Sequence, residues 1–141
     1  MKERAVELDH RGHRGTTEEI YPELSGSIIG AALRVHSALG PGLLESAYEA
    51  CLCHELNKAS ISFARQVPIP IRYDGLNLEC GFRLDLLVDN KAIVEVKAVD
   101  RISSIHHSQL LTYMRLTGTR LGLILNSNVR HLRDGISRLV L

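Results

Sequence analysis

The chain has 141 residues, of which 45% are hydrophobic and 23% are charged, a composition typical of one soluble globular domain. Its formal net charge is +1, it has no tryptophan and only 4% of its residues are aromatic, which argues against an aromatic platform for stacking single-stranded bases. No apolar run approaches the roughly 18 residues that a membrane span needs, and no signal-peptide core begins the chain, so we expect a cytoplasmic protein with free cysteines.

Residues 1–20 show no sustained hydrophobic period, and we expect them to form a flexible N-terminal arm. This arm contains His10 and His13, for which a solvated tail is a better interpretation than a metal site. We expect residues 21–141 to form a single domain.

Two helices are predicted at the start of this domain. Residues 25–40 place apolar side chains at helical spacing, and the Gly40-Pro41-Gly42 stretch ends that pattern. Residues 43–59 repeat it, with one apolar stripe expected to hold Leu44, Tyr48, Cys51, Leu52 and Leu56. Both segments are therefore expected to pack as amphipathic helices.

The pattern changes to β-forming residues over 65–99, where turn signals occur at Asp74-Gly75 and Asp89-Asn90. We predict an antiparallel meander of about three strands. Residues 103–118 return to helical spacing, with a serine N-cap and Gly118 as the stop. Strands are expected at 120–126 and 135–141. The order ααβββαβ predicts a mixed α/β domain with one sheet covered by helices.

Charged residues lie unexpectedly within the predicted meander. If residues 89–91 form its second turn, Asp85 faces Glu95 across the hairpin, with Cβ atoms about 4.5–5.5 Å apart. Because side chains alternate along a strand, Lys97 shares the face of Glu95 and Arg83 that of Asp85. The opposite face is expected to be wholly apolar, with Leu84, Leu86, Val88, Ala92, Val94, Val96 and Ala98.

Two explanations of this charged face are open. Two carboxylates at that distance repel each other unless a cation or a shared proton lies between them, and their hard oxygen atoms favour Mg²⁺ or Mn²⁺. A neighbouring lysine could then orient water or stabilise charge on a phosphate. Alternatively, Arg83 and Lys97 neutralise Asp85 and Glu95 in a cross-strand salt-bridge cluster.

The helix that follows adds polar side chains on one face. At 100° per residue, His106, Gln109 and Tyr113 fall within about 60° of one another, next to apolar neighbours, and we expect them to point toward the sheet. They could form a hydrogen-bonded network or the wall of an active site. The exposed side is then expected to hold Ser108, Thr112 and Arg115.

One further carboxylate stands at a helix start. Glu45 lies in the first turn of the second predicted helix, where a negative charge stabilises the N-terminus. Tyr48 shares its face one turn later, and its spacing is typical of a core residue. From spacing alone, helix capping is the better interpretation of Glu45.

Three motifs together resemble a known group of proteins. Asp85 followed by Glu95-Val96-Lys97 is similar to the D…E-x-K core of the PD-(D/E)XK nuclease superfamily, and residues 109–113 to the Q-x-x-x-Y helix of its λ-exonuclease-like branch. Residues 42–48, GLLESAY, resemble the signature of the GxxExxY family within that superfamily. The likeness extends over about residues 21–141, and it implies a restriction-endonuclease-like core with a mixed central sheet flanked by helices.

The resemblance also implies a metal site. By analogy, Asp85, Glu95 and the Val96 carbonyl would hold a divalent metal, Mg²⁺ or Mn²⁺, and Glu45 would complete the site from its helix. The sequence departs from the family at Asn126-Ser127-Asn128, where relatives have an N-F-N-like stretch, and loss of that aromatic residue is expected to expose or loosen the rim.

The remaining motif residues receive supporting roles from the same resemblance. Lys97 would position or activate the attacking water, and Gln109 and Tyr113 would support the site or contact the phosphate. His36 and His106 fit the family pattern without an assigned role, and His36 is best interpreted as a core residue.

The resemblance therefore implies a metal-dependent nuclease acting on nucleic acid, with DNA as the expected substrate and exonuclease or endonuclease action both open. A homodimer is an analogy with superfamily relatives only. The alternative is a catalytically silent nuclease-fold module that binds nucleic acid or a protein partner. A salt-bridged scaffold without a ligand is the third interpretation.

Overall fold

The computed structural model describes residues 20–79 and 82–141. Residues 1–19 of the predicted arm, with its two histidines, and Cys80 lie outside these described residues. Ile20, the last residue assigned to the arm, is instead buried in the hydrophobic core. Within them, Cys51 and Cys53 are free thiols. No helix in this part of the chain is both long enough and apolar enough to cross a membrane.

The first two helices form where the apolar periodicity predicts them. Helix α1 spans Pro22–Leu39, and Gly40 ends it with φ 69° while its N–H donates to the carbonyl of His36 at 2.8 Å. Glycine adopts this left-handed conformation without steric cost. Helix α2 spans Glu45–Lys58. The expected stripe is wrong at Leu44, which precedes α2 and is 75% exposed.

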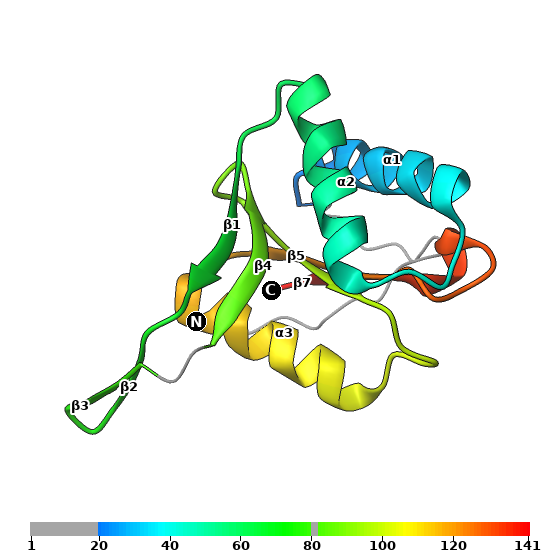
Figure 1. Cartoon of the computed structure of the whole chain (residues 1–141). Coiled ribbons are helices and arrows are strands. Elements are labelled where there is room, and N and C mark those ends of the chain that lie inside the picture. Colours follow the sequence, from blue (N-terminus) through cyan, green and yellow to red (C-terminus); the bar gives the residue numbers. More distant parts are fainter. Residues whose placement is uncertain (1–19, 80–81) are drawn as a thin grey trace.

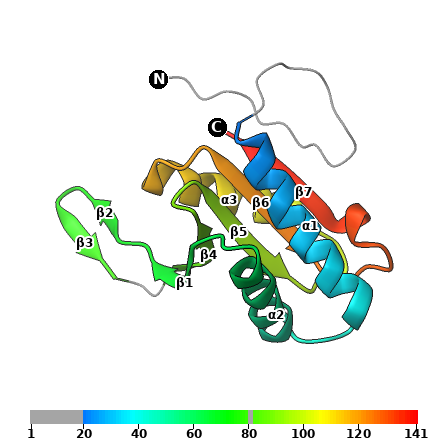
Figure 2. The same ribbon diagram turned by 90° about the horizontal axis from the view of Figure 1, so that it is seen from above.

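The meander holds more strands than the sequence predicts. The observed strands are β1 Phe63–Pro68, β2 Ile71–Tyr73, β3 Leu76–Leu78, β4 Arg83–Val88 and β5 Ala92–Lys97. Both predicted turns are present, with positive φ at Asp74, Gly75, Asp89 and Asn90. The Asp74-Gly75 turn closes a separate two-stranded hairpin, β2–β3, which projects beyond the end of β1 (Figure 2).

The second half of the chain completes the main sheet. Helix α3 spans Ser104–Thr117, strand β6 Leu121–Asn126, the 3₁₀ helix η1 Leu132–Gly135 and strand β7 Ile136–Val140. The sheet order is β1-β4-β5-β6-β7, and only the β5–β6 pair among these neighbours is parallel. A parallel pair needs a crossover connection, which α3 supplies.

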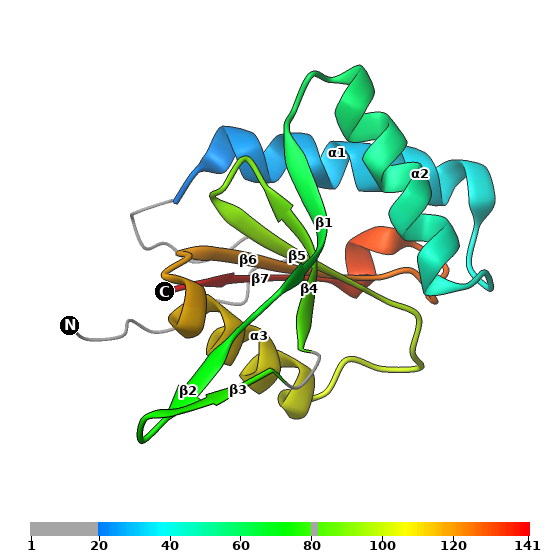
Figure 3. The same ribbon diagram turned by 60° about the vertical axis from the view of Figure 1, so that its left-hand side comes forward.

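Helices cover both faces of this sheet (Figures 1 and 3). Helices α1 and α2 pack on one face, through a buried cluster that includes Ile28, Leu56 and Val94. Helix α3 packs on the other through a second cluster that includes Leu110 and Ile93. The predicted apolar face is confirmed for Leu86, Val88, Ala92, Val94 and Val96, which belong to the cluster under α1 and α2. The other face is also partly apolar, because Ile93 and Leu87 contribute to the cluster under α3.

Candidate active site

The candidate site lies at one edge of the main sheet. Parallel strands β5 and β6 both end there, with Lys97 paired with Asn126, and antiparallel β4 begins there at Arg83. Loops that follow the carboxyl ends of parallel strands commonly carry functional groups. The sequence motifs around residues 85 and 95–97 therefore converge at an edge suited to binding a ligand.

The predicted hairpin register is confirmed, and it brings Asp85 and Glu95 together. Val88 pairs with Ala92 and Leu86 with Val94, after which the backbone ladder between β4 and β5 ends. Carboxylates then replace it: the Asp85 N–H donates to Glu95 Oε2 at 3.1 Å, and the Val96 N–H donates to Asp85 Oδ2 at 2.8 Å. Each acid is thus fixed by the backbone of the opposite strand.

Strand alternation also changes at this point. Leu86 joins the cluster under α1 and α2, whereas Leu84, two residues earlier, joins the cluster under α3. A regular strand would place both side chains on one face. The predicted apolar face is therefore wrong at Leu84. The change of face between Leu84 and Leu86 occurs at Asp85, where the carboxylate hydrogen bonds replace the β-ladder.

The electrostatic environment of the two acids favours a proton or a cation. Burial, followed by repulsion from Asp85, raises the pKa of Glu95 to about 8. Burial likewise raises the pKa of Asp85, while the Val96 N–H and Lys97 act in the opposite direction. Both pKa values rise because two negative charges close together and shielded from water are unfavourable. A positive charge between the carboxylates would offset this repulsion.

The structure does not form the salt-bridge cluster that the sequence left open. Arg83 is exposed, and no ion pair joins Arg83 or Lys97 to either acid among the described residues. Lys97 is half-buried, and its charge still lowers the pKa of Asp85 and Glu95 from a distance. Direct neutralisation by neighbouring side chains therefore does not explain why the acids are here.

A third buried acid, which the sequence motifs did not indicate, lies within electrostatic reach of this pair. Glu49 on α2 is 6% exposed, and it accepts bonds from Arg65 Nε at 3.0 Å and from Gln66 Nε2 at 3.1 Å. Its charge raises the pKa of both Asp85 and Glu95, so it lies within electrostatic reach of them. Its position one helical turn after Glu45 could have indicated that both acids lie on one face of α2. Its partners on β1 could not be predicted in this way, because they are distant in sequence.

Glu45 reaches the same edge by a different contact. Its carboxylate Oε2 accepts the backbone N–H of Ala98 at 3.0 Å, immediately after Lys97. Glu45 is exposed in the first turn of α2, so the helix position that suggested capping is correct. In the structure, however, the carboxylate holds the chain that leaves β5.

The three polar residues predicted on α3 divide. Tyr113 is 7% exposed, and burial raises its pKa, with the charges of Glu95 and Asp85 raising it further. His106 is half-buried and accepts the Ser103 N–H at Nδ1, at 2.9 Å, at the start of the helix. Gln109 is exposed, so the expectation that it points inward is wrong. The predicted exposed side is confirmed for Ser108, Thr112 and Arg115.

The loop after β6 is closed by buried polar residues. Asn126 is 2% exposed, accepts the Val99 N–H at 3.0 Å and donates to the Val99 carbonyl at 2.9 Å. Ser127 is 4% exposed, and its N–H donates to the Lys97 carbonyl at 2.8 Å. The expectation that serine at this position exposes the rim is therefore wrong, because Ser127 is packed inside it. His36 is buried, as expected.

Donor chemistry at this edge fits a hard divalent cation. Asp85 and Glu95 supply buried carboxylate oxygens whose mutual repulsion a cation would relieve, and Mg²⁺ usually takes one or two protein carboxylates together with water and phosphate oxygens. Within residues 20–79 and 82–141, no three or more His, Cys, Asp or Glu side chains form a group that could hold a metal ion. The structure thus brings Asp85 and Glu95 together and does not add Glu45 to them.

Comparison with known proteins agrees with this geometry. Residues 22–139 match the family model described as the PD-(D/E)XK nuclease superfamily. Searches of curated proteins and of solved structures give no match. The matched segment includes α2, β4, β5, α3 and β6, the elements that carry the residues of the candidate site.

Proposed function

Because the chain belongs to the PD-(D/E)XK nuclease superfamily, we propose that it is a divalent-metal-dependent nuclease that hydrolyses phosphodiester bonds in DNA. The observation that carries this proposal is the pairing of Asp85 and Glu95, close to Lys97, where strand β5 ends. Residues 42–48 further support placement in the GxxExxY branch. The substrate is DNA by analogy with the branch that the Q-x-x-x-Y helix resembles.

The carboxylates define where a cation would be held. Asp85 and Glu95 would bind it, together with the Val96 carbonyl, and Mg²⁺ or Mn²⁺ matches these oxygen donors. When bound, such a cation offsets charge on the phosphate and lowers the pKa of water. The protein's own contribution is to keep the two acids in place, which the Asp85 and Val96 backbone N–H groups do.

Lys97 and Tyr113 would act on the substrate. The Lys97 ammonium follows Glu95 by two residues on the same face, where it could donate a hydrogen bond to a non-bridging phosphate oxygen or orient the attacking water. The raised pKa of Tyr113 keeps its hydroxyl protonated as a donor beside the two acids. Exposed Gln109 is available to contact the nucleic-acid backbone one turn earlier.

We assign Glu45 a positioning role in this proposal. Its contact with the Ala98 N–H fixes the backbone directly after Lys97. Holding Lys97 is the role that the observed contact supports.

Cleavage of labelled DNA tests the proposal. Wild type should cut in Mg²⁺ or Mn²⁺ and stop on addition of chelator, whereas Asp85→Asn and Lys97→Ala should lose activity by a factor on the order of 10² or more. Asp89→Asn, an exposed acid in the turn of the same hairpin, is the matched control and should cut like wild type.

Two results would contradict the proposal. Wild type, Asp85→Asn and Lys97→Ala could cut equally well while folded, which would place the chemistry elsewhere. DNA binding without cleavage, and without dependence on divalent cation, would instead favour the catalytically silent binding module.

A further inference from the structure

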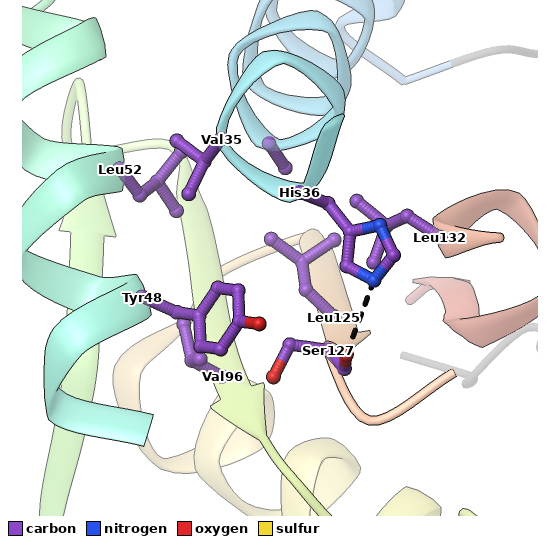
Figure 4. Close-up of a pocket in the computed structure, with 9 residues that line it drawn as sticks. Val35, His36, Tyr48, Leu52, Val96, Leu125, Ser127 and Leu132 are labelled. Carbon is purple, nitrogen blue, oxygen red and sulfur yellow. Dashed lines mark hydrogen bonds between the residues drawn. The ribbon is translucent and has the colours of Figure 1, made fainter. Parts of the chain in front are cut away.

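A small, mostly apolar pocket lies behind β5, on the sheet face that α1 and α2 cover (Figure 4). Its volume is 20 Å³, which is enough for one water molecule. Most of its lining is apolar, including Val35, Leu52 and Val96. Its polar groups come from His36, Tyr48 and Ser127.

The Tyr48 hydroxyl is a buried polar group in the wall of this pocket, without a partner among the described residues. Tyr48 is 4% exposed, and its hydroxyl oxygen has no hydrogen-bond partner within the described part of the chain. Buried tyrosine hydroxyls normally have a partner, because losing hydration without replacing it is unfavourable. Figure 4 shows the hydroxyl pointing toward Ser127 from the opposite wall of the pocket.

Ser127 connects this pocket to the candidate active site. Its Oγ donates to the Lys97 carbonyl at 3.2 Å, and its N–H donates to the same oxygen at 2.8 Å. His36 Nε2 donates to the carbonyls of Ser127 and Val129, at 3.2 and 2.9 Å, and so fixes the loop from behind. With its proton committed to Lys97, the Ser127 Oγ retains lone pairs that can accept a bond.

The peptide that Ser127 holds is also the one that Glu45 holds. The Lys97 carbonyl and the Ala98 N–H belong to one planar peptide unit. Ser127 donates hydrogen bonds to the carbonyl oxygen of this unit, and Glu45 accepts one from its N–H. Glu45 and Tyr48 are one turn apart on α2, on the same face of that helix. Helix α2 therefore contacts the N–H of this peptide through Glu45 and places Tyr48 near Ser127, which holds its carbonyl.

We propose that Tyr48 and Ser127 bind one buried water molecule, and that through it Tyr48 is a positioning residue for Lys97. The water accepts from the Tyr48 hydroxyl and donates to Ser127 Oγ, which in turn holds the Lys97 carbonyl. The positioning half of this inference rests on the proposed role of Lys97 in cleavage. The water site itself does not.

A crystal structure of the metal-free protein at high resolution tests the water site directly. We expect an ordered water within hydrogen-bonding distance of both Tyr48 Oη and Ser127 Oγ, and its loss in Tyr48→Phe. A dry pocket in wild type would overturn the inference, as would a Tyr48→Phe variant with a higher melting temperature than wild type. Tyr73→Phe, at a 71% exposed tyrosine, is the matched control for stability.

Steady-state cleavage kinetics test the positioning role. Tyr48→Phe should lower kcat roughly tenfold with KM unchanged, because Lys97 is displaced and substrate contacts remain. In the Lys97→Ala background the same substitution should have no further effect. A Tyr48→Phe variant with wild-type kcat, or equal losses in both backgrounds, would overturn it.

The two proposals fail separately. If wild type cuts DNA with divalent cation but Tyr48→Phe is unchanged and the pocket is dry, the nuclease proposal stands and this inference is wrong. If no cleavage occurs, the nuclease proposal and the positioning role are both wrong, and the ordered water still decides the binding site.

Discussion

The backbone N–H of Asp85 donates to the carboxylate of Glu95 at 3.1 Å, at the point where the ladder between their strands ends. The contact holds a buried carboxylate next to a second one, since Asp85 is itself fixed by the N–H of the residue that follows Glu95. These hydrogen bonds keep the two carboxylates close together despite their mutual repulsion. The pair therefore favours binding of a positive charge that would offset this repulsion.

The stability of the metal-free protein should depend on pH through Glu95. Its pKa rises from 4.5 to about 8 on folding, so between these values the folded state holds a proton that the unfolded state releases. Stability is then full below about pH 4.5 and falls as the pH rises through 8, by at most about 5 kcal/mol. Denaturant unfolding in chelator between pH 5 and 9 measures this.

Glu95→Gln is the matched variant for that experiment, because its amide oxygen can still accept the Asp85 N–H. We expect its profile to be flatter than that of wild type, and the variant to be the more stable of the two above pH 8. Parallel profiles for the two proteins would show that Glu95 is not the group responsible.

The pair of Arg65 and Glu49 should matter more than a similar pair on the surface. Arg65→Met removes a 3.0 Å hydrogen bond from a carboxylate that is 6% exposed and should cost about 1.5 kcal/mol of unfolding free energy. Arg34→Met breaks an equally short bond to Glu55 at an exposed position, and it should leave stability nearly unchanged. Equal losses in urea unfolding would contradict the importance of burial.

Two glycines offer a second matched comparison. A Cβ at Gly135 would overlap the backbone carbonyl oxygen of Asn126, so Gly135→Ala should cost about 2 kcal/mol or more and disturb the loop after β6. At Gly26, an exposed position in α1, a Cβ meets nothing within 4 Å, and alanine should stabilise the helix by about 0.5–1 kcal/mol. Thermal unfolding of both variants checks the opposite signs.

Much of the fold and the central pair of the site were predictable from local patterns. The Asp89-Asn90 turn fixes the hairpin register, because a slip of one residue would move every side chain to the other face. Apolar periodicity likewise locates α1, α2 and α3, and glycines mark the ends of α1 and α3. These features depend on residues close together in the chain.

Other features depend on contacts that no local pattern contains. The buried stripe of α3 is centred on Leu110 and Met114, and Gln109 lies about 120° from that centre, so it is exposed although Tyr113 is not. Glu49 becomes part of the site only because β1 brings Arg65 and Gln66 to it. The shift of Leu84 to the α3 cluster follows from the end of the β4–β5 ladder, which alternation cannot predict.

Calorimetric titration of Mn²⁺ into wild type, Asp85→Asn and Asp89→Asn tests most directly whether the paired acids hold a cation. We predict saturable binding to wild type and to Asp89→Asn, and its loss or strong weakening in Asp85→Asn. Equal affinity in all three folded proteins, or no binding to any of them, would contradict a metal site formed by Asp85 and Glu95.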